Sequence, residues 1–141
     1  MSEPEPLVEI VEHTADIGLR IRAATLPALF VAAARGLMSL ITDPASVRAT
    51  CVREVRLEAP EAADLLRAWL GEINVLHEVH GEVYGEFEVT TDGRTLVGRL
   101  SGEPFDSARH ERRAEVKAVT WHGLTLEPTE DGFQAEVLLD I

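Results

Sequence analysis

Cysteine, lysine and long apolar runs are all scarce in this sequence of 141 residues. The single cysteine, Cys51, excludes an internal disulfide and a zinc site built from cysteines. No stretch approaches the roughly 18 consecutive apolar residues that identify a membrane span. The first six residues are acidic and hold Pro4 and Pro6, unlike the basic start and apolar middle of a signal peptide. We therefore expect a soluble protein of the reducing cytoplasm.

Positive charge is scarce as well. The chain has 13 lysines and arginines against 25 aspartates and glutamates, which gives a formal net charge of −12 at pH 7. Phosphate contacts dominate the affinity of proteins for nucleic acids, so this chain is not expected to hold RNA or DNA by itself. A basic protein partner or a bound cation fits the charge better.

Several motifs of self-sufficient enzymes are missing too. The sequence contains no glycine-rich phosphate loop, no nucleophile elbow and no His-Glu-x-x-His zinc helix. An enzyme that uses a nucleotide on its own is therefore not supported.

The length and the 45% apolar content predict one globular domain. Residues 1–6 are expected to form a disordered tail, and residues 7–141 the domain. Apolar periodicity, helix caps and turn signals predict two helices and eight strands. In chain order these are strands at 7–12 and 17–22, a helix capped by Thr25 and ended by Asp43-Pro44, a strand at 52–58, a helix from Pro60 to Gly81, and strands at 83–89, 96–100, 115–121, 124–127 and 133–139. The expected fold is α+β, with two helices packed on mostly antiparallel β-sheets.

Aspartate is scarce enough to be examined residue by residue, with seven residues against eighteen glutamates. Four of the seven stand where aspartate commonly stabilises local structure, at helix ends and before glycine in turns: Asp43, Asp64, Asp92 and Asp131. Asp16, Asp106 and Asp140 remain without such an explanation. They are the candidates for a functional role.

Asp140 is the most informative of these three. In the strand expected at 133–139 the apolar residues alternate, which places Asp140 on the opposite face. The carboxylate of Ile141 lies close to its side chain, and Ca²⁺ or Mg²⁺ would relieve the repulsion between the two. The alternative is a polar residue at a frayed chain end.

Asp16 also has two interpretations. It could cap the turn between the first two expected strands, or it could serve a metal site or catalysis. His13, three residues earlier, is a possible ligand or base, although short His-x-x-Asp patterns are common.

The segment from Arg109 to Lys117 holds four of the thirteen basic residues. In this acidic chain it is the one place for a phosphate or an acidic partner surface, and the alternative is a solvated loop followed by a strand. Alternation in that strand puts Lys117 and Val119 on one face, and the residues on the other face are Val116, Ala118 and His122.

The histidines allow two kinds of role. His110 and His122 could act as general acids or bases. His77 and His80 stand near the end of the second expected helix, where they would complement its negative end.

Four short motifs stand out when the chain is taken as a whole. They are His13-Thr14-Ala15-Asp16 followed by Ile17-Gly18, Gly102-Glu103-Pro104-Phe105-Asp106 with His110 behind it, the run from Glu115 to His122, and the final Leu139-Asp140-Ile141. In this order, from about residue 8 to residue 141, they resemble the archease family. The chain departs from the family at Trp121, where tyrosine is usual.

The resemblance implies a function. Archeases are partner proteins of the RtcB-type RNA ligase, which joins a 2′,3′-cyclic phosphate or 3′-phosphate end to a 5′-hydroxyl in tRNA splicing and RNA repair. They promote GTP-dependent guanylylation of the ligase and support its multiple turnover. The chain is thus expected to be a non-catalytic activator of the ligase. Its expected fold is the archease-like sandwich. Its expected partners are the ligase and, through the ligase, GTP, with no stable binding to nucleic acid and none to a membrane.

The resemblance also implies a site. The family binds a divalent cation, calcium, through positions that match Asp16, Asp140 and Ile141, and Mg²⁺ or Mn²⁺ would suit the same ligands. The residues expected to contact the ligase or its nucleotide are Lys117, His13, His122 and Asp106.

Two other classes of function are open at this point. One is a metal-dependent phosphohydrolase or nuclease, with Asp16 and Asp140 as ligands and His13 or His122 as the base. The other is a chaperone-like binding module without chemistry.

Overall fold

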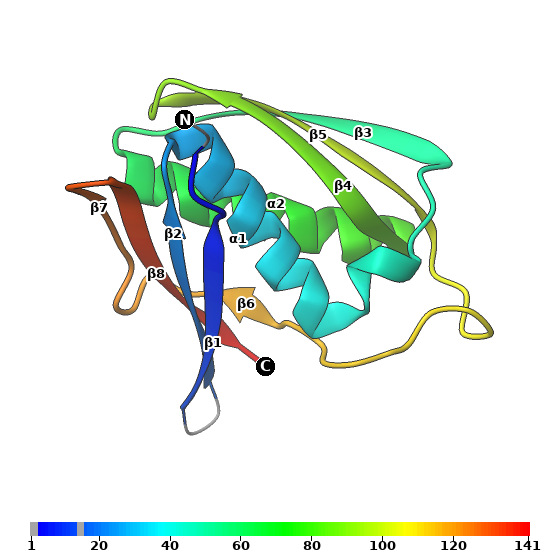
Figure 1. Cartoon of the computed structure of the whole chain (residues 1–141). Coiled ribbons are helices and arrows are strands. Elements are labelled where there is room, and N and C mark those ends of the chain that lie inside the picture. Colours follow the sequence, from blue (N-terminus) through cyan, green and yellow to red (C-terminus); the bar gives the residue numbers. More distant parts are fainter. Residues whose placement is uncertain (1–2, 14–15) are drawn as a thin grey trace.

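Two helices lie between two antiparallel sheets in the computed structural model (Figure 1), which describes residues 3–13 and 16–141. The first two residues of the predicted 1–6 tail lie outside the described residues, as do Thr14 and Ala15 of the first motif. The disordered tail therefore stays a prediction.

The elements follow the predicted order, with one short 3₁₀ helix in addition. The helices are α1 (Leu26–Ile41), η1 (Pro44–Ser46) and α2 (Ala62–His80). The strands are β1 (Leu7–His13), β2 (Asp16–Ala23), β3 (Cys51–Glu58), β4 (Glu82–Thr91), β5 (Thr95–Pro104), β6 (Ala118–Val119), β7 (Thr125–Thr129) and β8 (Gly132–Asp140). The predicted α+β class is confirmed.

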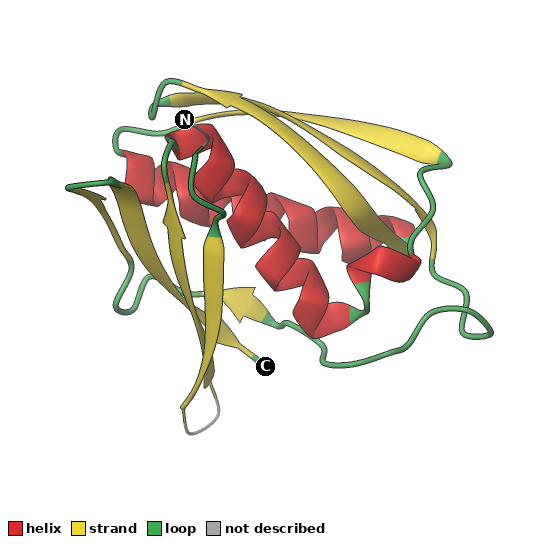
Figure 2. Ribbon diagram, in the orientation of Figure 1, coloured by secondary structure: helices red, strands yellow, loops and turns green. Residues whose placement is uncertain are grey.

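The strands form two separate sheets (Figure 2). One has the order β1-β2-β8-β6, with β7 also paired to β8, and the other has the order β3-β5-β4. Every pair is antiparallel, so the three predicted hairpins β1–β2, β4–β5 and β7–β8 are confirmed. Because β2 pairs with β8, the two ends of the sequence lie side by side in one sheet.

Local signals explain where α1 begins. The hydroxyl of Thr25 accepts a hydrogen bond from the backbone N–H of Ala28 at 3.2 Å, which is the predicted N-cap. Leu29, Phe30 and Leu37 recur at helical spacing and are buried. The apolar stripe of α1 is therefore what anchors it between the sheets.

The second helix starts later than predicted and ends where predicted. Glu61 keeps an extended backbone, with φ −135° and ψ 155°, so α2 begins at Ala62 and Pro60 stays outside it. Gly81 adopts the left-handed conformation, with φ 63°, that glycine reaches without strain. The boundary set by glycine is thus the more predictable of the two.

Trp69 of α2 joins the two helices to the second sheet. Its ring nitrogen Nε1 donates to the carbonyl oxygen of Phe30 in α1 at 3.0 Å. A Cβ atom at Gly98 of β5 would lie 2.4 Å from the Trp69 ring, so only glycine lets the strand approach so closely. The core is therefore centred on the layer of helices.

The predicted strand at 115–121 is wrong in extent, because only Ala118–Val119 forms β6. Val116 and Val119 are both buried, whereas Lys117 and Ala118 are exposed, so the predicted alternation of faces is also wrong. The cause is that the carbonyl oxygen of Val116 accepts a hydrogen bond from the Asn74 side chain of α2 at 2.9 Å. A backbone group that a longer strand would need is thus used by a helix.

Neither helix of the described residues is long and apolar enough to span a membrane.

Candidate functional site

Two aspartates face each other at one end of the β1-β2-β8-β6 sheet. Asp16 begins β2, and it pairs directly with Asp140, the last residue of β8. Leu19 and Leu139 turn their buried side chains toward the helices, so both aspartates project from the opposite, outer face. Directly opposed residues of an antiparallel pair have Cβ atoms about 4.5–5.5 Å apart. Asp16 and Asp140, called the acid pair below, therefore lie side by side.

The acid pair breaks the pattern of the strands that carry it. The other polar pairs on this outer face are complementary, and they are Arg20 with Glu136 at 2.9 Å and Arg22 with Gln134 at 3.2 Å. Asp16 and Asp140 instead set two negative charges opposite each other, which destabilises a sheet. In the described part of the chain, neither carboxylate takes part in a hydrogen bond or an ion pair. Among the residues that the structure describes, the pair thus has no balancing charge.

The last residue and the single lysine lie beside the acid pair. The backbone N–H of Lys117 donates to the carbonyl oxygen of Asp140 at 2.7 Å, and Ala118 of β6 pairs with the same residue. The side chain of Lys117 is exposed. Ile141 is half-buried and packs against the core, so its side chain holds the end of β8 in place. Residues from three parts of the sequence therefore meet here.

The ligands offered at this place suit a hard divalent cation. Carboxylate and backbone carbonyl oxygens are the ligands that Ca²⁺ and Mg²⁺ prefer, and Asp16, Asp140 and Ile141 would supply them. Over residues 3–13 and 16–141, no group of three or more His, Cys, Asp or Glu side chains is arranged to hold a metal ion. A site here would therefore depend on two side chains and on the backbone oxygen of Ile141.

His122 lies near the acid pair. It is exposed in the turn that follows β6, and it lines a hollow of about 280 Å³ together with Gly18 and Leu138. Gly18 and Leu138 are paired two positions further along the same strands as the acid pair. The backbone of His13 pairs with Asp16, and its side chain lies outside the described residues. Both histidines thus come from the same end of the molecule as the acid pair.

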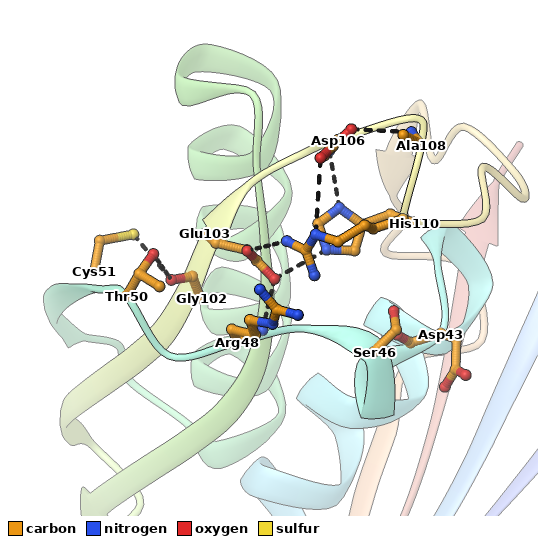
Figure 3. A network of polar contacts seen from close by, with 11 residues as sticks. Asp43, Ser46, Arg48, Thr50, Cys51, Gly102, Glu103, Asp106, Ala108 and His110 are labelled. Atoms are coloured by element: carbon orange, nitrogen blue, oxygen red, sulfur yellow. Dashed lines mark hydrogen bonds and ion pairs between the residues drawn. The ribbon is translucent and has the colours of Figure 1, made fainter.

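A second acidic centre is built around Glu103 of β5 (Figure 3). Its carboxylate accepts hydrogen bonds from the backbone N–H of Arg48 at 2.7 Å, from His110 Nε2 at 3.0 Å and from the guanidinium of Arg109. The Arg48 N–H, followed by His110 and Arg109, lowers the pKa of Glu103 to about 2, although burial acts in the opposite direction. The negative charge of Glu103 is thus balanced by donors from the protein itself.

His110 is a structural residue, which corrects its suggested role as a general acid or base. It is 4% exposed, and its Nδ1 accepts the backbone N–H of Asp106 at 2.8 Å. The hydrogen-bond pattern therefore assigns the ring proton to Nε2, which donates it to Glu103. Neither ring nitrogen is left to exchange a proton with a substrate.

Asp106 belongs to the same network. Its Oδ1 accepts the backbone N–H of Ala108 at 2.9 Å, which stabilises the loop after β5. Within the described ranges, no contact joins Asp106 to the acid pair. Its predicted contact with the ligase stays a prediction, and its visible role resembles that of the four structural aspartates.

The basic segment 109–117 is largely used by the fold. Arg109 pairs with Glu103, and the guanidinium of Arg112 stacks on Phe105 with 4.2 Å between Cζ and the ring centre. Arg113 donates to the carbonyl oxygens at the end of α1, including that of Ser39 at 2.9 Å. The prediction of a phosphate or partner surface therefore narrows from the segment to Lys117.

The role of Glu103 was not predicted from the sequence. Alternation along β5 buries Leu96, Gly98 and Leu100 on the inner face and predicts Glu103 on the outer one. Its burial results from the loop that carries Arg109 and His110, which folds over it (Figure 3). The motif Gly102-Glu103-Pro104 was the feature of the sequence that could have pointed to a special role for Glu103.

The two sheets around two helices define a small α+β sandwich with a carboxylate pair on one outer face. The sequence model described as the Archease protein family matches residues 9–141. The "Protein archease" of Methanopyrus kandleri is 38% identical over 137 residues, which covers 94% of this chain and 98% of that protein. Its counterpart in Thermococcus gammatolerans is 39% identical over 128 residues, which covers 88% and 90%. The chain therefore belongs to the archease family, as the four motifs predict.

Solved structures agree with this assignment. The solution structure of protein 1598 of Methanobacterium thermoautotrophicum superposes with a TM-score of 0.78 at 30% identity, over 95% of this chain and 98% of that one. The crystal structure of an archease of Thermotoga maritima, described as a possible chaperone, has a TM-score of 0.67 at 22% identity, over 100% and 98%. The second similarity shows the fold alone.

Proposed function

We propose that this archease-family chain is a cytoplasmic accessory protein that activates an RtcB-type RNA ligase in tRNA splicing and RNA repair. In this proposal it promotes GTP-dependent guanylylation of the ligase and multiple turnover, and it catalyses no step itself. The observation that carries the proposal is the acid pair, two opposed carboxylates with no ion pair to a described residue, beside an exposed lysine.

The acid pair is the proposed metal site. Asp16, Asp140 and Ile141 would hold a divalent cation, which is calcium in the family resemblance, with Mg²⁺ or Mn²⁺ as alternatives. When bound, the cation would cancel the repulsion within the acid pair and present positive charge to a phosphate.

The chain's own residues supply position and charge. Asp16 and Asp140 are held in register by β2 and β8, so the ligands are set by a sheet and not by a mobile loop. Lys117 follows a buried residue, and its exposed ammonium group would contact the nucleotide of the ligase. His13 and His122 would add contacts to the ligase from the same end of the molecule, and Asp106 from the loop after β5.

The net charge of −12 supports separate roles for this chain and the ligase. An acidic chain is repelled by the RNA backbone, so it is suited to meet the ligase while the ligase holds the RNA. The three arginines of the basic segment do not make the chain a binder of RNA by itself. Each of them contacts a carboxylate, an aromatic ring or a carbonyl oxygen within the fold.

A guanylylation assay tests the proposal. Radiolabelled GTP is incubated with the cognate ligase and with the wild-type chain, Asp16→Ala or Asp140→Ala, and labelled ligase is measured. We expect the wild type to stimulate labelling and both variants to lose the stimulation while remaining folded. Glu136→Ala is the matched control, because Glu136 lies on the same face of β8 but is paired with Arg20. Full stimulation by the two aspartate variants would refute the role of the acid pair.

The competing hydrolase hypothesis is tested with the isolated chain. Turnover of a phosphodiester substrate that depends on added metal and disappears in Asp140→Ala would favour a metal-dependent phosphohydrolase or nuclease. We expect no such turnover.

A further inference from the structure

Three large apolar side chains are exposed on the side of the molecule formed by α2. Val75 is 48% exposed, Val79 is 70% exposed, and Trp121, in the turn after β6, is 58% exposed. Val75 and Val79 are four residues apart, so they share one face of the helix. The opposite face, with Leu66 and Ile73, is buried. The face of α2 that carries Val75 and Val79 is therefore not covered by the described part of the chain. The helix itself lies behind α1 in Figure 1.

The uncovered face of α2 is acidic around its apolar residues. Asp64, Glu72 and Glu78 lie on this side of the helix, and none of them forms a salt bridge within the described residues. The one arginine of this face, Arg67, stacks on Trp121, with 3.8 Å from its Cζ atom to the ring centre. Arg67 precedes Val75 by eight residues, which is about 12 Å along a helix, so the exposed apolar side chains are spaced along α2 among acidic ones. This arrangement is complementary to a basic, amphipathic helix that runs along α2.

This face is continuous with the acid pair. The side chain of Asn74 in α2 donates to the carbonyl oxygen of Val116 at 2.9 Å, and the next residue, Lys117, donates its N–H to Asp140. Trp121 follows Thr120, whose N–H donates to Leu138 of β8 at 2.9 Å. The acid pair is on the outer face of the β1-β2-β8-β6 sheet and α2 is on its inner face, and β6 is the edge strand between them. A partner that binds both therefore passes around this edge.

We propose that Val75, Val79 and Trp121 form a docking surface for a basic amphipathic helix of the ligase, separate from the acid pair. Helices bind apolar surfaces through residues spaced three or four apart, and tryptophan is over-represented among the residues that dominate binding energy. The docking surface would fix the orientation of the complex and leave activation to the acid pair and Lys117. This inference rests on the proposed function for the identity of the partner.

The first test measures the dissociation constant between the ligase and the full chain by calorimetry. We expect Val79→Arg and Trp121→Ala to weaken binding by about tenfold or more, because tryptophan anchors at interfaces are costly to remove. Ile10→Arg is the matched control, since Ile10 is 50% exposed on β1, in a sheet edge that does not pack on α2. Thermal unfolding of all variants confirms that they are folded.

The outcomes separate the docking surface from the proposed function. If the wild-type chain stimulates the ligase and both variants bind as tightly as the wild type, the docking surface is refuted and the activator role stands. Asp140→Asn should show the reverse behaviour, with retained binding and lost stimulation. Higher salt should weaken binding of the wild type, because the border of the surface is charged.

A second test needs no ligase. The probe is a peptide of about 18 residues with leucine and lysine at helical spacing, compared with a counterpart that has glutamate in place of lysine. Trp69 is buried, so a change in tryptophan fluorescence reports on Trp121. We expect the basic peptide to shift the emission to shorter wavelength and to shield it from acrylamide in the wild type but not in Val79→Arg. No response to the basic peptide, or an equal response to both peptides, would overturn the docking surface.

Discussion

Glu103 and the acid pair are two acidic centres of one small domain, and they differ in whether the protein balances their negative charge. Glu103 is buried and receives hydrogen bonds from Arg48, His110 and Arg109. Asp16 and Asp140 face each other at the edge of the domain, with no such donor among the described residues. An acid that the fold balances contributes to stability, whereas an acid that the fold leaves unbalanced is available to an external cation.

The largest loss of stability is expected from His110→Ala. It removes a buried ring and leaves the N–H of Asp106 without its partner. It also removes one of the two donors to Glu103 Oε2, which keeps the N–H of Arg48. We expect the free energy of unfolding to fall by about 3 kcal/mol, from the cavity, the unpaired N–H and the weaker hold on Glu103 together. Urea unfolding measures this, and His122→Ala is the control. An equal loss in both variants would show that burial of the imidazole is unimportant.

Acid should weaken the fold through Glu103. Its pKa in the folded chain is lowered to about 2 from an ordinary value of 4.5. Its contribution to stability is therefore complete above pH 4.5 and is lost as the pH falls toward 2, because the unfolded chain takes up a proton that the folded chain excludes. Urea unfolding at several pH values should show a shallower acid dependence for Glu103→Gln. Glu54→Gln, on an exposed residue of β3, should keep the dependence of the wild type.

Removing one charge of the acid pair should increase stability, whereas the changes at His110 and Glu103 reduce it. In a chelating buffer, Asp140→Asn is expected to raise the free energy of unfolding by about 0.5 kcal/mol, because it ends the repulsion between opposed carboxylates. Glu136→Gln, on the same face, should lower it by a similar or smaller amount, since it breaks the exposed pair with Arg20. Destabilisation by Asp140→Asn would mean that the carboxylate has a stabilising partner within the protein.

The smallest effect on stability is expected from Lys117→Gln, because the contact of Lys117 with Asp140 uses the backbone N–H and its side chain is exposed. We expect unchanged unfolding and a loss of ligase stimulation of about tenfold, as for removal of a charge-assisted contact to phosphate. Arg99→Gln, on an exposed residue of β5, is the control. Full stimulation by Lys117→Gln would remove this lysine from the proposed site.

Features encoded by neighbouring residues were predictable from the sequence. The Thr25 cap and the apolar stripe that follows it define α1, and Gly81 marks the end of α2. Asp92 precedes Gly93 and accepts the N–H groups of Arg94 and Thr95, which is the turn expected for this dipeptide. Each of these signals acts within a few residues, so no knowledge of distant contacts was required.

Features that depend on distant contacts were predicted only in part. Alternation placed Asp140 on the outer face, but its register against Asp16 follows from the pairing of β2 with β8 and is not visible in either strand alone. The segment 115–121 has the pattern of a strand, yet the C-terminal end of α1 and Asn74 of α2 take up the backbone groups around it. Its pattern of buried residues therefore follows the helices and not the sheet.

Calorimetric titration of Ca²⁺ into the metal-free chain tests the central claim most directly, namely that the unbalanced acid pair is a cation site. We expect the wild type to bind one Ca²⁺ ion, with Asp16→Asn and Asp140→Asn each weakening the affinity by about tenfold or more. Glu103→Gln should bind as the wild type does at a temperature where it is folded. Equal binding by the wild type and both aspartate variants, or no binding of Ca²⁺, Mg²⁺ or Mn²⁺ by the wild type, would contradict the claim.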